Sequence, residues 1–233
     1  MKRRKGFIEL DDYRYIVAKE LPLSFAAESV HKTLINLEYV NVDKTLKVIQ
    51  VSSALTGEGK TSLLINLAYV LKERGKKVLT VDLDLRRPKI HRVFDVANEH
   101  GLTEYLAGKI TREQLIRVDD VTGIHYVLSG EKTVAVTNIL EATKLKEFFE
   151  EIRKEYDYIL VDAPPVLAVS DALYISKLSD GILYVIAQDF AKKNDIKEAV
   201  QTLKRADANI LGAVLTRVKL KSKSYKYYYN YED

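Results

Sequence analysis

Short apolar runs rich in β-branched residues alternate with helix-like segments along most of the chain. Six of these runs predict strands that are apolar on both faces, over residues 47–54, 77–85, 124–129, 156–163, 181–187 and 210–218. Between them, apolar residues recur at helical spacing, in segments 61–74, 142–155 and 191–205. Buried strands separated by helices are typical of a parallel sheet covered by helices on both sides. The pattern predicts one doubly wound, mostly parallel α/β domain over residues 46–218.

Two segments flank that domain. A helix is predicted within roughly residues 22–40, with Val30, Leu34 and Leu37 on one side, so that residues 1–45 form a helical arm. Residues 219–233 carry several lysines and five tyrosines without an apolar pattern, which predicts a flexible tail. The net charge is +4, and basic runs stand at both ends of the chain. We expect these runs to be solvated, with contact to an anionic membrane surface as the alternative.

Composition narrows the functional classes. Of the 233 residues, 47% are hydrophobic and 30% charged, which excludes a largely disordered chain. No run reaches the roughly 20 apolar residues of a membrane-spanning helix. Acidic residues follow the N-terminal basic cluster, where a secretory signal would be apolar. The absence of cysteine excludes disulfides, thiolate zinc sites and cysteine nucleophiles. We therefore expect a cytoplasmic protein.

A glycine-rich loop follows the first predicted strand. Residues 54–61 read ALTGEGKT, the Walker A pattern with alanine in place of its first glycine. Glycines at these positions let backbone N–H groups converge on phosphate oxygens, and the following helix adds its positive end. The lysine reaches the β- and γ-phosphates, and the threonine binds magnesium. A simple glycine turn is the alternative. The neighbouring strand, helix and carboxylates favour nucleotide binding by Thr56, Gly57, Glu58, Gly59, Lys60, Thr61 and Ser62.

Aspartates close two of the predicted strands. Asp82 and Asp84 end the segment VLTVDLDL, and Asp162 ends YILVDA. Residues two apart in a strand share one face, with Cα atoms roughly 6.5–7 Å apart, so both carboxylates can approach one magnesium or divide metal binding from proton acceptance. Open α/β sheets bind ligands at the carboxyl ends of their strands. A helix cap or turn is the alternative for each aspartate alone. Together they favour a metal site, with Thr61, Asp82 and Asp162 as its ligands.

Three segments in combination resemble a bacterial tyrosine kinase. They are ALTGEGKTS, VLTVDLDLRRP and YDYILVDAPPVLAVSDA. The piece DLDLRRP is the most specific, because an arginine pair and a proline after alternating aspartates are not general features of phosphate-loop proteins. The resemblance runs from about Glu28 to the tail. It is to the free-standing cytoplasmic subunit of capsular and exopolysaccharide systems (CpsD/CapB type).

The resemblance implies a P-loop NTPase fold of the MinD/ParA-like kind and a protein-tyrosine autokinase that uses ATP and Mg²⁺. Lys60, Asp82, Asp84 and Asp162 are then the catalytic residues, and Asp84 orients or deprotonates the acceptor hydroxyl. The implied acceptors lie in the chain's own tail or a neighbour's, at Tyr225, Tyr227, Tyr228, Tyr229 and Tyr231. Taken alone, such a tail is equally compatible with a low-complexity segment or an edge strand.

The resemblance also implies partners. They are a membrane-anchored adaptor of the polysaccharide co-polymerase type, a cognate tyrosine phosphatase and further copies of the chain in a ring, with no nucleic acid. The protein would lie at the inner face of the cell membrane through the adaptor and regulate polysaccharide synthesis and export. Each tail phosphate adds about −1.5 to −2 charges, so phosphorylated tails would repel one another and dissociate the ring.

The chain departs from the family pattern in the arm. Relatives carry Glu-x-x-Arg-x-x-Arg there for contacts between subunits, whereas here Glu28 is followed by His31 and Leu34. Neither replacement makes the forked bond of an arginine to a carboxylate, so the usual ring contacts are lost or altered. Thr216 stands where relatives often carry an asparagine near the adenine pocket. Arg86 and Arg87 steer phosphate, contact a neighbouring chain or lie in a solvated turn; the sequence leaves these three alternatives open.

Two other functions share the expected fold. An ATP-driven switch of the plasmid-partition or septum-positioning kind (ParA/MinD type) carries a second lysine early in the loop, where this chain has Leu55, and lacks a tyrosine tail. A non-catalytic assembly subunit of a polysaccharide export complex binds ATP without transferring phosphate, and the intact loop lysine and aspartates argue against it. A dinucleotide enzyme needs Gly-x-Gly-x-x-Gly after the first strand, and that motif is missing. The kinase hypothesis is favoured.

Overall fold

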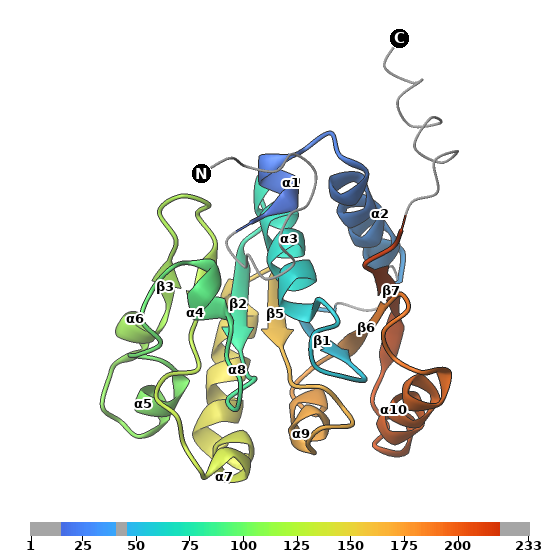
Figure 1. Ribbon diagram of the computed structural model, residues 1–233. Helices are drawn as coiled ribbons and strands as arrows, with labels where there is room; N and C mark the ends of the chain where they lie inside the picture. Colours follow the sequence, from blue (N-terminus) through green and yellow to red (C-terminus); the bar gives the residue numbers. More distant parts are fainter. Residues whose placement is uncertain (1–14, 41–45, 220–233) are drawn as a thin grey trace, which may run out of the picture.

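The computed structural model describes residues 15–40 and 46–219. Within these ranges, seven strands form one sheet in the order β3-β4-β2-β5-β1-β6-β7 (Figure 1). Neighbouring strands are parallel, except that β3 and β4 are antiparallel. The strands are β1 (Val48–Ser53), β2 (Val78–Asp82), β3 (Arg117–Val118), β4 (His125–Val127), β5 (Tyr158–Asp162), β6 (Gly181–Ala187) and β7 (Ile210–Thr216).

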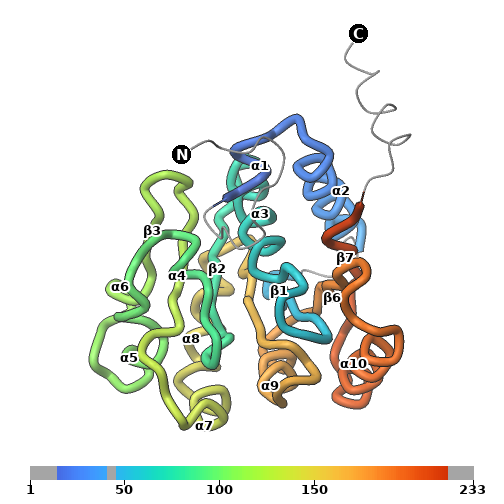
Figure 2. Tube along the Cα trace, in the orientation of Figure 1, coloured from blue at the N-terminus to red at the C-terminus, as the bar shows by residue number. Residues whose placement is uncertain are grey.

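Helices cover both faces of the sheet (Figures 1 and 2). One face carries α1 (Val17–Glu20), α2 (Phe25–Val40), α3 (Lys60–Glu73) and α4 (Ile90–Val93), which share one apolar core with the strands. The other face carries α7 (Val136–Glu141), α8 (Thr143–Glu155), α9 (Asp171–Ser176) and α10 (Lys193–Arg205), together with the short α5 (Leu102–Leu106) and α6 (Arg112–Leu115). The doubly wound, mostly parallel α/β fold predicted from the sequence is confirmed.

The central strands alternate their side chains between the two cores. In β1, Ile49 and Val51 face the α3 layer, whereas Val48 faces the α8 layer. Both faces are buried, which explains why the corresponding runs are apolar without interruption. At the edge of the sheet β7 differs, because its residues are partly or fully exposed. The prediction that this strand is buried on both faces was wrong. β7 is the last strand in the sheet order and pairs with β6, so less of its surface is covered than that of the central strands.

The predicted arm helix is present as α2. It buries Ala27, Val30, Leu34 and Leu37 against the core on the α3 side of the sheet. The preceding α1 is tied to α3 by the Ala18 N–H, which donates to the Asn66 side chain at 2.9 Å. No helix among the described residues is both long enough and apolar enough to cross a membrane.

Several short elements were not predicted, namely α1, β3, α4, α5, α6, α7 and α9. With two to six residues each, they are too short to display a hydrophobic period. The strand predicted over residues 77–85 ends at Asp82, because a compact loop begins there.

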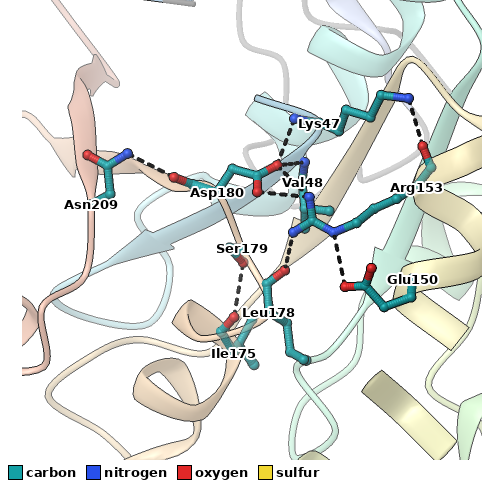
Figure 3. Close-up of polar contacts among 9 residues, drawn as sticks. All are labelled: Lys47, Val48, Glu150, Arg153, Ile175, Leu178, Ser179, Asp180 and Asn209. Atoms are coloured by element: carbon teal, nitrogen blue, oxygen red, sulfur yellow. Dashed lines mark hydrogen bonds and ion pairs between the residues drawn. The ribbon is translucent and has the colours of Figure 1, made fainter. Parts of the chain in front are cut away.

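A charged cluster closes the amino-terminal edge of the sheet (Figure 3). Arg153 of α8 donates to both carboxylate oxygens of Asp180, at 2.8 and 2.9 Å, and to the Leu178 carbonyl at 3.0 Å. One of those oxygens also accepts the N–H groups of Lys47 and Val48, each at 2.8 Å. The cluster thereby joins α8, β1 and the start of β6 with its polar groups paired.

Candidate active site

The glycine-rich loop between β1 and α3 lies at the carboxyl edge of the sheet. Gly57 and Gly59 have φ angles of 89° and 90°, in the left-handed region that residues with a Cβ rarely adopt. α3 begins at Lys60, directly after Gly59, so the unpaired N–H groups of its first turn face the loop. Converging N–H groups and a positive helix end form a site for anions.

The side chain of Glu58 holds this loop in place. It is fully buried, and its two oxygens accept the N–H groups of Leu55 at 2.7 Å and of Ala187, at the end of β6, at 2.9 Å. The Thr216 hydroxyl, at the end of β7, donates to the Glu58 carbonyl at 2.7 Å. The Arg217 guanidinium donates to the Gly57 carbonyl. The loop is therefore fastened to two neighbouring strands.

The two acidic strand ends are adjacent. β2 and β5 are neighbouring parallel strands, and their register sets Asp82 directly beside Asp162. The hydroxyl of Thr61, in the first turn of α3, donates to Asp162 Oδ2 at 2.5 Å. The other oxygen, Asp162 Oδ1, is buried and has no hydrogen-bond partner among the described residues. The glycine-rich loop and both strand ends thus meet at one point.

Burial dominates the electrostatics of this point. It raises the pKa of Asp162 to about 6, against the opposing effects of Lys60 and the Thr61 hydroxyl. Burial and then the charge of Asp162 raise the pKa of Asp82 well above its ordinary value. Burial also lowers the pKa of Lys60, although Asp162 and Asp84 counteract it. Two carboxylates and one ammonium group are therefore held in an environment that disfavours charge.

Asp82 also organises the loop that follows β2. Its Oδ1 accepts the Asp84 N–H at 3.2 Å, and its Oδ2 accepts the N–H groups of Lys89 and Ile90 at 2.9 and 3.0 Å. Asp84 Oδ1 accepts the Arg87 N–H at 3.0 Å. These bonds turn the chain out of the sheet after Asp82. Asp84 consequently lies in a loop, and the prediction that it shares a strand face with Asp82 was wrong.

A cavity of about 430 Å³ opens beside the glycine-rich loop. Its polar end is lined by Gly57, Gly59, Lys60, Thr61 and Ser62. Its apolar part lies between α2 and the end of β7, with Phe25, Val30 and Leu215 among the lining residues. The arm helix therefore supplies one wall of the cavity, which the sequence did not predict.

The residues present fit a magnesium ion and a polyphosphate. Within the described ranges, no three His, Cys, Asp or Glu side chains form a metal-binding group on their own. Magnesium, however, is commonly held by one or two protein oxygens together with phosphate oxygens and water. The unpartnered Asp162 Oδ1 beside the Thr61 hydroxyl supplies such oxygens. The glycine turns and Lys60 supply the complementary groups for phosphate.

Comparison with known proteins identifies the family. Residues 46–215 match the AAA domain family. The chain is 33% identical over 220 residues to the tyrosine-protein kinase YwqD of Bacillus subtilis, a match that covers 94% of this chain and 93% of that protein. The kinase domain of the Escherichia coli tyrosine kinase ETK superimposes with a TM-score of 0.83 at 30% identity, over 89% of this chain and 83% of that one. The chain belongs to the bacterial tyrosine kinase family. The resemblance inferred from the three motifs is thereby confirmed.

The P-loop fold extends beyond the kinase family. The cell-division ATPase MinD of Pyrococcus furiosus superimposes with a TM-score of 0.63 at 28% identity, covering 76% of this chain and 74% of that one. Both TM-score and coverage are higher for the tyrosine kinase domain. The nucleotide-binding P-loop fold is common to the two classes, and the family assignment separates this chain from the switch proteins.

The structure locates the site residues predicted from the sequence. The carboxyl edge of the sheet brings together Lys60, Thr61, Asp82, Asp84 and Asp162. Thr56 is exposed on the glycine-rich loop, and Ser62 is exposed in the first turn of α3. The five tail tyrosines lie outside the described residues. The sequence did not reveal the hydrogen bonds from Thr216 and Arg217 that hold the glycine-rich loop. It also did not reveal that Asp171 is the partner of Arg86. In the arm, Leu34 is buried in the core, so that position does not face outward as a subunit contact would.

Proposed function

We propose that the chain is a magnesium-dependent protein-tyrosine autokinase, which transfers the γ-phosphoryl group of ATP to tyrosines of its own or a neighbouring subunit's tail. Membership of the tyrosine kinase family supports the activity. The observation that carries the site is the bond from Thr61 to Asp162, which joins the glycine-rich loop to the acidic strand ends. A kinase of this class requires both phosphate-binding and metal-binding groups at one place.

Each residue has a proposed role. Backbone N–H groups of residues 56–62 and the Lys60 ammonium bind the phosphates of ATP. Thr61 and Asp162 would hold magnesium, together with Asp82, which lies directly beside Asp162. The ion would neutralise charge that develops on the phosphate oxygens. Asp84 accepts the tyrosine hydroxyl proton. The phenolic oxygen bonds to the γ-phosphorus as the bond from that phosphorus to the β–γ bridging oxygen breaks, which releases ADP.

We propose that Asp84 acts on the acceptor rather than on the metal. It lies two residues beyond the end of β2 and is 8% exposed, whereas Asp82 is fully buried and accepts three backbone N–H groups. Asp84 is also close enough to affect the pKa values of Lys60 and Asp162. Because Asp84 is not one of the proposed metal ligands, its carboxylate can receive a proton without any change in the groups that would hold the metal.

The proposed substrates are Tyr225, Tyr227, Tyr228, Tyr229 and Tyr231. The last described residue, Lys219, directly follows the part of the chain at 216–218 that lines the cavity, so the tail starts beside the site. The proposed context is regulation of capsular or extracellular polysaccharide synthesis, with a membrane-anchored adaptor, a cognate phosphatase and a homo-oligomer as partners. Without the usual arginines of the arm, we propose that any ring uses different contacts.

Mass spectrometry of the purified protein tests the proposal. The full chain is incubated with magnesium and labelled ATP, with and without the cytoplasmic segment of its adaptor, and phosphotyrosines are mapped. We expect label on the tail, and we expect a loss on the order of a hundredfold or more in Lys60→Met, which removes the charge that stabilises the transferred group. The matched control is Lys72→Met, a partly exposed lysine of the same helix. ATP hydrolysis without phosphotyrosine under both conditions would instead support a nucleotide-driven switch.

A further inference from the structure

An arginine–aspartate pair bridges the loop after β2 and the start of α9. Arg86 Nε donates to Asp171 Oδ2 at 2.6 Å, and Arg86 Nη2 donates to Asp171 Oδ1 at 3.1 Å. Two such bonds fix the relative orientation of both groups, which a single ammonium contact does not. The Asp171 side chain is 1% exposed and that of Arg86 is 45% exposed. A partly exposed loop is thus anchored on a buried point.

The anchored loop is the one that carries Asp84. The bonds from the N–H groups of Asp84, Lys89 and Ile90 to Asp82 set the internal shape of this loop. The fork from Arg86 instead attaches the loop to α9. The connection from β5 leads into that helix, and β5 ends in Asp162. On the other side of Asp84, the Leu83 N–H donates to the Asp162 carbonyl at 2.9 Å. The fork is therefore a second attachment, which fixes the chain two residues after Asp84.

We infer that Arg86 and Asp171 are positioning residues for phosphoryl transfer, because their fork holds Asp84 beside the Lys60 and Asp162 side chains. The inference rests on the function proposed above. Neither residue contacts the reacting atoms in this scheme, and both act through Asp84. Orientation of this kind matters kinetically, since displacing a reacting group by about 1 Å lowers a rate by about a hundredfold.

The pair between Arg153 and Asp180 provides a matched structural control. It also joins one arginine to both oxygens of one aspartate (Figure 3), although through the single nitrogen Nη1 rather than through two nitrogens. It lies at the start of β6, at the amino-terminal edge of the sheet, whereas the glycine-rich loop lies at the carboxyl edge. Both of its side chains are partly buried, at 24% and 21% exposed. A purely structural role for Arg86 predicts that the two pairs respond alike to substitution.

Substitution of the two pairs separates these roles. Arg86→Lys keeps the charge and removes the fork, Asp171→Asn removes the charge at constant size, and Arg153→Lys is the control. We expect each of the first two variants to lower the maximal rate of phosphotyrosine formation by about tenfold, with less than a twofold change in the MgATP concentration for half-maximal rate. The double variant should be no more than about twofold slower than the slower single variant, because both remove one contact. Arg153→Lys should lower Tm and leave the maximal rate unchanged.

Amide hydrogen exchange in the absence of nucleotide gives a second readout. We expect the N–H groups of Arg87, Lys89 and Ile90 to exchange faster in Arg86→Lys and in Asp171→Asn than in the unaltered protein, and to be unchanged in Arg153→Lys. The inference is overturned if Arg86→Lys and Asp171→Asn both keep the unaltered maximal rate. It is also overturned if the exchange of this loop is unaltered in both variants. An equal loss of rate in Arg153→Lys also overturns it.

The same experiment separates this inference from the proposed function. An unaltered protein that forms no phosphotyrosine disproves the kinase proposal, and the exchange measurement then decides by itself whether the fork holds the loop. An active protein whose variants keep full rate disproves only the positioning role. If Asp171→Asn fails to fold, Arg86→Lys still tests the contact, because its altered side chain is partly exposed.

Discussion

The two edges of the sheet use similar charged groups in different ways. At the amino edge, the Arg153 guanidinium and backbone N–H groups satisfy both oxygens of Asp180 (Figure 3). At the carboxyl edge, Asp82 and Asp162 lie side by side, and Asp162 Oδ1 has no partner among the described residues. Buried carboxylates without full pairing reduce stability, whereas paired ones do so much less. The charges of the amino edge are paired and hold α8, β1 and β6 together, whereas one carboxylate oxygen of the carboxyl edge has no partner within the described ranges.

The largest expected effect concerns catalysis at the carboxyl edge. Asp162→Asn should lower the rate of phosphotyrosine formation on the order of a thousandfold, because it removes the proposed charged metal ligand next to Thr61. The measurement is phosphotyrosine formation with MgATP, and the control is Asp180→Asn at the other edge. A rate within tenfold of the unaltered protein would exclude Asp162 from the metal site.

The same substitution should stabilise the protein without nucleotide or magnesium. The pKa of Asp162 is about 6 in the folded protein and about 3.9 in an unfolded chain. Because the pKa is raised in the folded state, the favourable contribution of the protonated Asp162 side chain to the free energy of unfolding is fully present below pH 4. It is lost as the pH rises through 6 and the side chain becomes charged. Asp162→Asn should therefore gain up to about 3 kcal/mol at pH 7. That gain should shrink to nothing near pH 4 in urea unfolding. A loss of stability at pH 7 would contradict the electrostatic assignment.

At the amino edge the expected effect is on stability alone. Arg153→Ala should lower the free energy of unfolding by about 2 kcal/mol, less than for a fully buried pair because both partners are partly exposed. The maximal kinase rate should be unchanged. Urea unfolding and the phosphotyrosine assay measure the two quantities on the same preparation. A fall in rate at full stability would show that the edges are not independent.

The smallest expected effect concerns Glu58, whose side chain holds the glycine-rich loop in place. Glu58→Gln leaves one acceptor oxygen where Leu55 and Ala187 donate two N–H groups. We expect a loss of about 1–1.5 kcal/mol in stability, because one buried N–H loses its partner. Nucleotide affinity should fall with it, as measured by titration with a fluorescent ADP analogue. Unchanged stability and affinity would mean that Thr216 and Arg217 are sufficient to hold the loop.

Much of the fold could be predicted because the signals were local. β1, β5, β6 and α3 were predicted to within about two residues from apolar runs and helical spacing. The family was predicted from three motifs, each of which is an unbroken stretch of sequence. The short helices between β2 and β5 were missed, because they are shorter than the windows in which a period can be seen.

The site was predictable only in part. The glycine-rich loop and the aspartates stood out because their spacing along the chain reflects their chemistry. The partner of Arg86 was not predictable, since Asp171 lies 85 residues away and each residue alone is compatible with a solvated turn. The role of Asp82 in shaping its loop was also missed, because it depends on N–H groups that return to it only when the loop is folded.

The amino-acid sequence by itself determined the long strands and helices, their order along the chain, and the types of residue at the strand ends, because burial and glycine chemistry act over short stretches of chain. Tertiary structure decided which strand ends become neighbours and which charges are paired. Strand order and register place Asp82 beside Asp162, and the packing of α8 against the sheet brings Arg153 to Asp180. Those contacts join residues that are distant in sequence, so only the packed sheet brings them together.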